Sequence, residues 1–196
     1  MRVLIIIVLT SLPIFLWAQG GWVNDGANIQ VATGTDVRIE SGGIGNLNNG
    51  TITNEGNIYL DLDWTQTGVT SNYTGMGWMW FEGNSNQNIS SASPLVIPKL
   101  RVDNGNKLIL NTPLSISYAV DLTNNGSIEL GLNNLILNPG ASFNNYDENN
   151  YIITNSTGYL QQEVSTGAIV FPVGNSTYNP ATLNNLGTTD NFQISV

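Results

Sequence analysis

The sequence predicts an all-β protein built as a parallel β-solenoid, a stack of short β-helix-like coils, followed by an antiparallel β segment. Charged residues make up only 10% of the chain, and most of its polar residues are Asn, Ser, Thr and Gln. This composition favours strands and turns over helix surfaces. The sequence also repeats itself around turns that contain Asn and Gly, and self-similarity at a period of about 20 residues is typical of solenoids.

Three nine-residue segments carry the repeat. Residues 52–60 read ITNEGNIYL, residues 122–130 read LTNNGSIEL, and residues 102–110 read VDNGNKLIL with the glycine one place early. The copies that begin at Val102 and Leu122 are 20 residues apart, and stacked coils would set asparagines above one another, where their amides can form ladders. Short strands between regular turns also fit a β-sandwich, which is the alternative fold.

The net charge and the missing residue types exclude several classes of function. With 5 basic and 14 acidic residues, the formal net charge is −9, so the chain lacks the basic footprint of a nucleic-acid-binding protein. It has no cysteine and no histidine, which excludes disulfides, thiolate metal sites and Ser-His-Asp or Cys-His catalysis within this chain. We therefore predict a non-enzymatic protein that has no cofactor.

Residues 1–18 have the character of a secretory signal peptide. Arg2 precedes an apolar run that continues to Trp17 and ends at the small residue Ala18. Polar residues and a proline interrupt this run, which therefore falls short of the ~20 residues of a transmembrane span. We expect cleavage near Ala18, and a mature protein, starting at Gln19, that is extracellular or exposed on the cell surface and has no membrane span.

Residues 19–150 are predicted to form the solenoid domain. Its first strands, Ile29–Val31 and Val37–Ile39, suit the irregular coils of a capped end. A later strand is bounded by Pro94 and Pro98, because proline lacks the backbone donor that a strand interior needs.

Residues 51–64 show the clearest alternation of apolar and polar side chains. Asp61 and Asp63 fall on the polar face, where two carboxylates on one strand would lie about 7 Å apart. We interpret them as solvated, with a paired-carboxylate hydrolase site or a calcium site as alternatives. The side chains expected on the core face are Ile58, Leu60, Leu62 and Trp64.

Residues 75–83, GMGWMWFEG, form the densest aromatic stretch. Trp78 and Trp80 share one face of the expected strand, and the residues that follow each of them share the other. Packing in the core is the main interpretation, because strands with bulky residues on both faces are usually covered on both. The alternative is a platform for stacking sugar rings, with Tyr73, Trp78 and Trp80 as the ligand-binding residues.

The polar run at residues 144–150 marks the expected end of the solenoid domain. Residues 151–196 read as the start of a second β unit of antiparallel hairpins. The sequence stops within a strand pattern, so we expect this unit to be truncated. The strands expected here are Tyr151–Thr154, Tyr159–Val164, Ala168–Val173 and Asn191–Val196.

Several short motifs resemble those of secreted and cell-surface β-repeat proteins of the Bacteroidota. They are WAQ at residues 17–19, WFEG at 80–83 followed by QNI at 87–89, and FPVG at 171–174 followed by YNPA at 178–181. Members of this largely uncharacterised group are typically exported by the type IX secretion system and carry a C-terminal sorting domain. The resemblance implies export and a surface location, although the present sequence departs from the group in lacking a sorting domain.

Three functions are compatible with these observations. The leading hypothesis is a non-enzymatic, secreted cell-surface module, structural or adhesin-like, whose partners are polysaccharides or other surface components. The second is a carbohydrate-binding module that uses exposed Trp and Tyr residues. The third is a β-helix polysaccharide lyase or hydrolase, which needs a basic residue beside carboxylates. Arg38 is far in sequence from the acidic pair, and the other basic residues of the mature chain are Lys99, Arg101 and Lys107.

Overall fold

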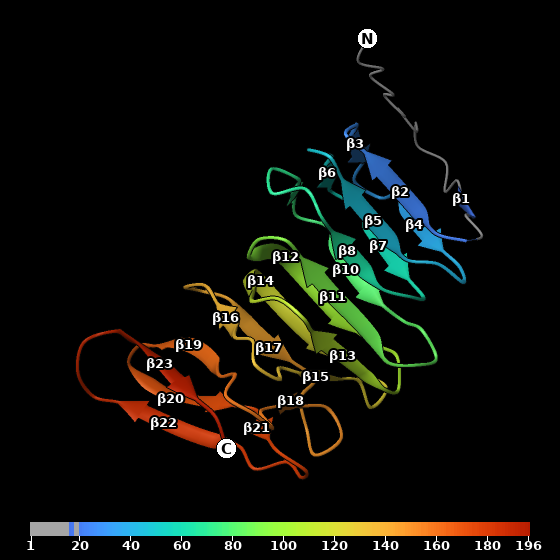
Figure 1. Ribbon diagram of the computed structural model, residues 1–196. Coiled ribbons are helices and arrows are strands. Elements are labelled where there is room, and N and C mark those ends of the chain that lie inside the picture. The colour runs from blue at the N-terminus through green and yellow to red at the C-terminus, as the bar shows by residue number, and fades with distance from the viewer. Residues whose placement is uncertain (1–15, 18–19) are drawn as a thin grey trace.

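The computed structural model describes residues 16–17 and 20–196 (Figure 1). Its regular secondary structure is entirely β, and the described residues wind as a parallel β-solenoid followed by antiparallel strands, as predicted. None of the described residues belongs to a helix with the length and apolar character that crossing a bilayer requires. The predicted signal peptide, residues 1–18, lies outside the described residues except for Leu16 and Trp17, and it stays a prediction.

The largest sheet, called sheet A, has ten strands. Nine of them follow one another across the sheet, and the tenth, β17, pairs with β14 beside β16. The strands are β1 (Leu16–Trp17), β4 (Asp36–Ile39), β7 (Asn57–Leu60), β10 (Trp78–Phe81), β12 (Leu95–Val102), β14 (Leu114–Leu122), β16 (Leu135–Leu137), β17 (Ser142–Asn144), β19 (Leu160–Val164) and β23 (Asp190–Ile194).

Two further parallel sheets complete the coils, and one antiparallel pair follows them. Sheet B consists of β2 (Trp22–Asp25), β5 (Ile44–Leu47), β8 (Trp64–Gln66), β11 (Gln87–Ser91), β13 (Lys107–Leu110), β15 (Ser127–Glu129), β18 (Ile152–Ile153) and β21 (Val173–Gly174). Sheet C consists of β3 (Asn28–Val31), β6 (Thr51–Asn54) and β9 (Asn72–Thr74), and the antiparallel pair is β20 (Gly167–Phe171) with β22 (Ala181–Asn185).

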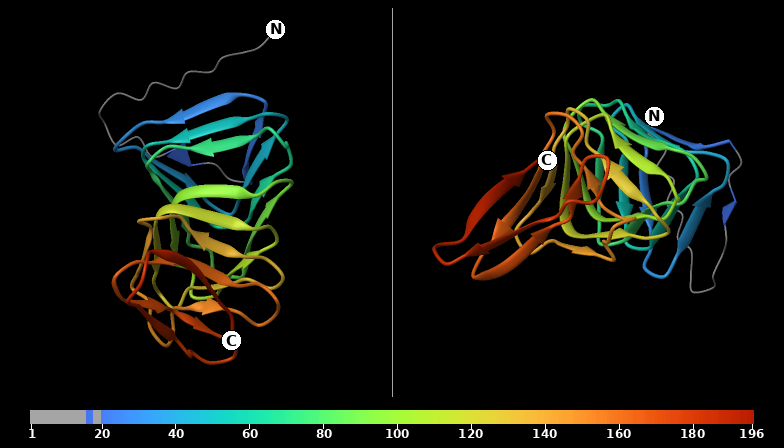
Figure 2. Two further views of the ribbon diagram at one scale, coloured as in Figure 1. Left: turned by 90° about the vertical axis from the view of Figure 1, so that its left-hand side faces the viewer. Right: turned by 90° about the horizontal axis from the view of Figure 1, so that it is seen from below.

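Each of the first three coils visits sheets B, C and A in that order. Thus β2, β3 and β4 form the first coil, and the next two coils repeat the pattern with β5 to β7 and β8 to β10. All strand pairs between these coils are parallel. Figure 2 shows the resulting stack from two further sides.

In the fourth and fifth coils, one long strand, β12 and then β14, replaces the strands of sheets C and A. In β12, Leu95–Ile97 and Lys99–Val102 each pair in parallel with β14, and the register shifts between Ile97 and Lys99. Pro98 lies at this shift, so the expectation that it ends the strand is wrong. A proline is tolerated inside β12 because the irregularity relieves it of a ladder hydrogen bond.

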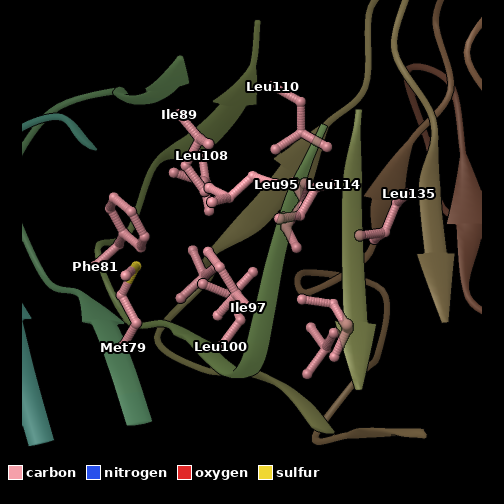
Figure 3. Packing of buried hydrophobic residues seen from close by; sticks show 14 of the residues in the cluster. Met79, Phe81, Ile89, Leu95, Ile97, Leu100, Leu108, Leu110, Leu114 and Leu135 are labelled. Atoms are coloured by element: carbon pink, nitrogen blue, oxygen red, sulfur yellow. The ribbon is translucent and has the colours of Figure 1, made fainter. Parts of the chain in front are cut away.

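The hydrophobic core is organised in columns that take one side chain from each coil. In one such column, successive members pair across sheet A, and each member is at most 1% exposed. Figure 3 shows Met79, Phe81 and Leu100, among other side chains, pointing into the interior. Each coil is therefore stabilised mainly by the coils directly before and after it. The column consists of Ile39, Leu60, Phe81, Val102 and Leu122.

Amide side chains also stack inside the solenoid, as the sequence predicts. Asn24, Asn46 and Gln66 occupy paired positions of sheet B and are buried. Asn24 Nδ2 donates to Asn46 Oδ1 at 2.9 Å, and Asn46 Nδ2 donates to Gln66 Oε1 at 3.2 Å. Gln66 Nε2 then donates to the backbone oxygen of Ser71 at 3.1 Å. This ladder satisfies buried polar groups that would each cost about 1–3 kcal/mol if left unpaired.

Two of the three sequence repeats are structurally equivalent. Residues 102–110 and 122–130 both run from sheet A to sheet B, and their strands pair in register. Residues 52–60 instead join sheet C to sheet A through β6 and β7. The Asn-Gly pattern therefore marks corners in general. In two of the segments Gly105, Asn124 and Asn125 adopt the positive φ that these residues accept.

The parallel sheets continue past residue 150. β18 pairs with β15, β19 with β16 and β21 with β18, all in parallel. The expected domain boundary at residue 150 therefore does not coincide with a change in the sheets, and the first two strands expected to be antiparallel belong to the solenoid. Antiparallel strand pairing begins with β19, which pairs in parallel with β16 on one side and antiparallel with β23 on the other, and it continues with β20 and β22.

Gly56 and Gly45 provide a matched test of close packing between coils. A Cβ added at Gly56 would lie 2.2 Å from the backbone oxygen of Thr35, whereas at Gly45 its nearest contacts, on Leu47 and Val23, would be at 3.8 Å. We expect Gly56→Ala to lower the free energy of unfolding by about 1–3 kcal/mol and Gly45→Ala to change it by less than about 0.5 kcal/mol. Chemical denaturation measures both, and equal effects would contradict the stated packing.

Candidate functional site

Tyr73, one of the three residues predicted to contact sugars, is part of the core. It is 3% exposed, and its hydroxyl accepts a hydrogen bond from Asn54 Nδ2 at 2.9 Å. Its ring meets that of Trp64 edge-on, with 5.3 Å between the centroids. Burial raises the pKa of the Tyr73 hydroxyl well above its ordinary value. Tyr73 is therefore a packing residue, and the prediction that it stacks on a ligand is wrong.

Trp78 and Trp80 lie on the outer face of sheet A. They are half-buried, whereas Met79 and Phe81, which alternate with them along β10, are fully buried. The alternation expected from the sequence is thus present. The two tryptophans have different surroundings, however, because each belongs to a different column of outward-facing side chains.

Trp80 lies in a column in which cations and aromatic rings stack on one another. Arg38, Tyr59, Trp80 and Arg101 occupy paired positions on four neighbouring strands. The guanidinium carbon of Arg38 is 4.1 Å from the ring centroid of Tyr59, and that of Arg101 is 4.1 Å from the ring centroid of Trp80. Between them, the Tyr59 and Trp80 centroids are 4.9 Å apart. Each cation–π contact is worth about 0.5–2 kcal/mol.

The cations at the two ends of this column are held by carboxylates. Arg38 pairs with Glu82, and Arg101 pairs with Asp121 at 3.3 Å and with Asp103 at 3.5 Å. Burial raises the pKa of Glu82 despite the opposing effect of Arg38. Because Tyr59 and Arg101 lie against its ring, Trp80 offers no free aromatic face for a ligand.

Trp78 lies in a neighbouring column that is much less filled. Its paired residues on the adjacent strands are Asn57 and Lys99. Asn57 Nδ2 donates to Asp36 Oδ1 at 2.7 Å, and Lys99 Nζ is 5.8 Å from the Trp78 ring centroid. The aromatic pairs among the described residues do not include Trp78. Tyr73, Trp78 and Trp80 are the three predicted contact residues. Among the residues that the structure describes, Trp78 is the one of these three that faces outward and has no aromatic ring stacked on it.

Asp61 and Asp63 do not lie on a strand face. They occupy the corner between β7, which ends at Leu60, and β8, which begins at Trp64. Asp61 Oδ2 accepts from the backbone N–H of Ser41 at 2.7 Å, and Asp63 Oδ1 accepts from that of Asn88 at 2.8 Å.

The two carboxylates thus bond to coils on opposite sides of their own, and the expected pairing on one strand face is wrong. Leu62, expected in the core, is 45% exposed at the same corner. The described residues contain no group of three or more Asp, Glu, His or Cys side chains that could hold a metal ion. The calcium alternative therefore gains no support from this corner.

The structure brings together basic residues that are far apart in sequence. Arg38, Lys99 and Arg101 lie on the same outer face of sheet A, on β4 and β12. The signal that reveals this is a constant interval: Arg38, Tyr59, Trp80 and Arg101 follow one another at 21 residues. The sequence prediction missed it because residues of different chemistry occupy equivalent positions.

Comparison with known proteins leaves the function to be inferred from this geometry. No protein-family model, curated protein or solved structure matches the chain.

Lys107, the remaining basic residue of the described chain, lies on sheet B and gives a pH-dependent contribution to stability. Its Nζ donates to Glu129 at 2.6 Å, and Asn155 Nδ2 donates to the same carboxylate at 2.9 Å. These two hydrogen bonds lower the pKa of Glu129. A carboxyl whose pKa is lower in the folded state stabilises the fold above its unfolded pKa, and the contribution is lost as the pH falls through the folded pKa.

We therefore expect Glu129→Gln to lower the free energy of unfolding at pH 7 by no more than about 1 kcal/mol, because solvent screens this partly exposed pair. The difference from the native chain should shrink as the pH falls below the ordinary glutamate value of 4.5. When Lys107 is replaced by Met, the effect of Glu129→Gln on the free energy of unfolding should be small at every pH. Urea denaturation across pH measures it, and a difference that grows toward acid would disprove the assignment.

Proposed function

We propose that this chain is a secreted, non-enzymatic β-repeat module of the cell surface that serves as a structural or adhesin-like element. The observation that carries the proposal is the use of polar and charged side chains to lock one coil to the next. The internal amides, the Arg38 and Arg101 column and the corner carboxylates all bond between coils. Such a stack suits a semi-rigid spacer that presents its outer faces.

The chemistry of the side chains supports a non-catalytic role. The chain has no histidine or cysteine, and therefore lacks the commonest general base and the thiol nucleophile. The carboxylates Asp61 and Asp63, considered for a hydrolase or lyase, accept backbone hydrogen bonds from different coils. Of the four basic residues that a lyase could use, Arg38, Arg101 and Lys107 are in ion pairs, and among the described residues only Lys99 has no carboxylate oxygen within 4.0 Å.

The secreted and surface location rests on the signal-peptide pattern of residues 1–18 and on the resemblance to exported Bacteroidota proteins. Carbohydrate binding is the second candidate, and one observation favours it. Trp78 is half-buried on the outer face of sheet A, beside Lys99 and outside the stacked column.

Location can be tested with a protease site inserted between Leu186 and Gly187. Leu186 is 91% exposed in the turn between β22 and β23, so an insertion there should leave the sheets intact. We expect the protein that carries this inserted site, expressed in its own producing cell, to be cut by protease added to intact cells or to be found in the medium. Immunoblotting of cells and medium measures this.

A periplasmic protein that carries the same site serves as the control and should stay intact. Cleavage of the tagged chain only after lysis would contradict the surface location. Depolymerisation of a polysaccharide by the purified chain would contradict the non-enzymatic role, whatever its location.

A further inference from the structure

The outer face of sheet A carries a cation that has no counter-ion. Arg38, Arg101 and Lys107 each have a carboxylate oxygen within 4.0 Å, but among the described residues Lys99 has none. Its ammonium lies near the ring of Trp78, at 5.8 Å from the centroid. In a chain with a net charge of −9, Lys99 is thus the cation of the described residues that remains available to an anionic ligand.

Aromatic residues occur on the strands on both sides of Lys99, and the one on β14 precedes the residue that pairs with Lys99. Trp78 on β10, Lys99 on β12 and Ala119 on β14 are paired in register. Tyr118, directly before Ala119, is 47% exposed. Neighbouring strands lie about 4.8 Å apart, so Trp78 and Tyr118 come from strands on the two sides of Lys99. These three residues are called the Lys99 surface.

We propose that the Lys99 surface binds an acidic polysaccharide, one whose sugar rings carry carboxylate groups. Trp78 and Tyr118 offer apolar ring surface with a polar edge, which suits the C–H face of a pyranose ring. The Lys99 ammonium then pairs with the sugar carboxylate. This inference rests on the proposed adhesin-like function and names the ligand class of its outer face.

Charge complementarity favours an anionic glycan over a neutral one. A neutral glycan would leave the Lys99 charge without a partner, whereas a carboxylate would compensate it. Elsewhere the protein is acidic and repels an anionic polymer, so the polymer is directed to this face. The nearby cation Arg101 is already matched by Asp103 and Asp121, which leaves Lys99 as the anchoring charge.

Affinity electrophoresis of the secreted chain through gels that contain polygalacturonate tests the proposal. We expect the native chain to be retarded, with an effect that weakens as salt is added. Lys99→Gln should weaken the apparent affinity at least about tenfold, which is the loss of about one charge-assisted contact. Trp78→Ala should abolish retardation, and Trp78→Phe should preserve most of it. Far-UV circular dichroism checks that each variant is folded.

Lys107→Gln is the matched control, because it removes the same charge from sheet B and should bind like the native chain. Laminarin, a neutral glucan, serves as the second probe and should not retard the protein. The proposal is overturned if polygalacturonate does not retard the native chain, if Lys99→Gln binds as well as the native chain, or if laminarin binds equally well. If the protein is cut on intact cells but polygalacturonate does not retard it, the proposed structural role at the surface is retained and only the acidic polysaccharide is excluded as its ligand.

Discussion

The fold depends on one constraint, the register of parallel strands from coil to coil. A parallel ladder places each side chain directly over its equivalent in the next coil, about 4.8 Å away. Every position must therefore tolerate a close neighbour from the adjacent coil. The core meets this requirement with apolar columns, the inner face of sheet B with the Asn24, Asn46 and Gln66 amides, and the surface with two stacked rings that have a cation at each end. Each arrangement pairs groups that attract at that spacing.

The same constraint decides which aromatic residues remain available on the surface. Trp80 lies between Tyr59 and Arg101, so the stacking that stabilises the coils also occupies its ring. Trp78, two residues earlier in the same strand, has Asn57 and Lys99 as its column neighbours. Two residues that look equivalent in the sequence thus differ in how their rings are covered because their neighbours differ. A tryptophan on a solenoid must be judged by its column as well as by its strand face.

The sequence predicts the fold better than it predicts the site. The turns at residues 102–110 and 122–130 indicate stacking, because their spacing equals one coil, and the structure confirms the solenoid. The antiparallel expectation is wrong for β18 and holds on one side only for β19, which pairs in parallel with β16 and antiparallel with β23, because strand patterning does not distinguish parallel from antiparallel partners. The same limitation affects Asp61 and Asp63: alternation extends through a corner as readily as along a strand. Tyr73 was misplaced because it faces inward in a strand of only three residues, too short for alternation to show its direction.

From β4 to β12 the coils keep a constant number of residues between successive strands of sheet A and absorb differences in length elsewhere. Along sheet A, Ile39, Leu60, Phe81 and Val102 follow at intervals of 21 residues, whereas along sheet B the intervals from Trp22 to Leu110 range from 20 to 25. In these coils the differences in length thereby fall outside the paired residues of sheet A. Duplication of a coil within a gene would lengthen the rod by one strand spacing and leave the remaining contacts unchanged. Evolution can therefore tune the reach of such a protein without redesigning its core.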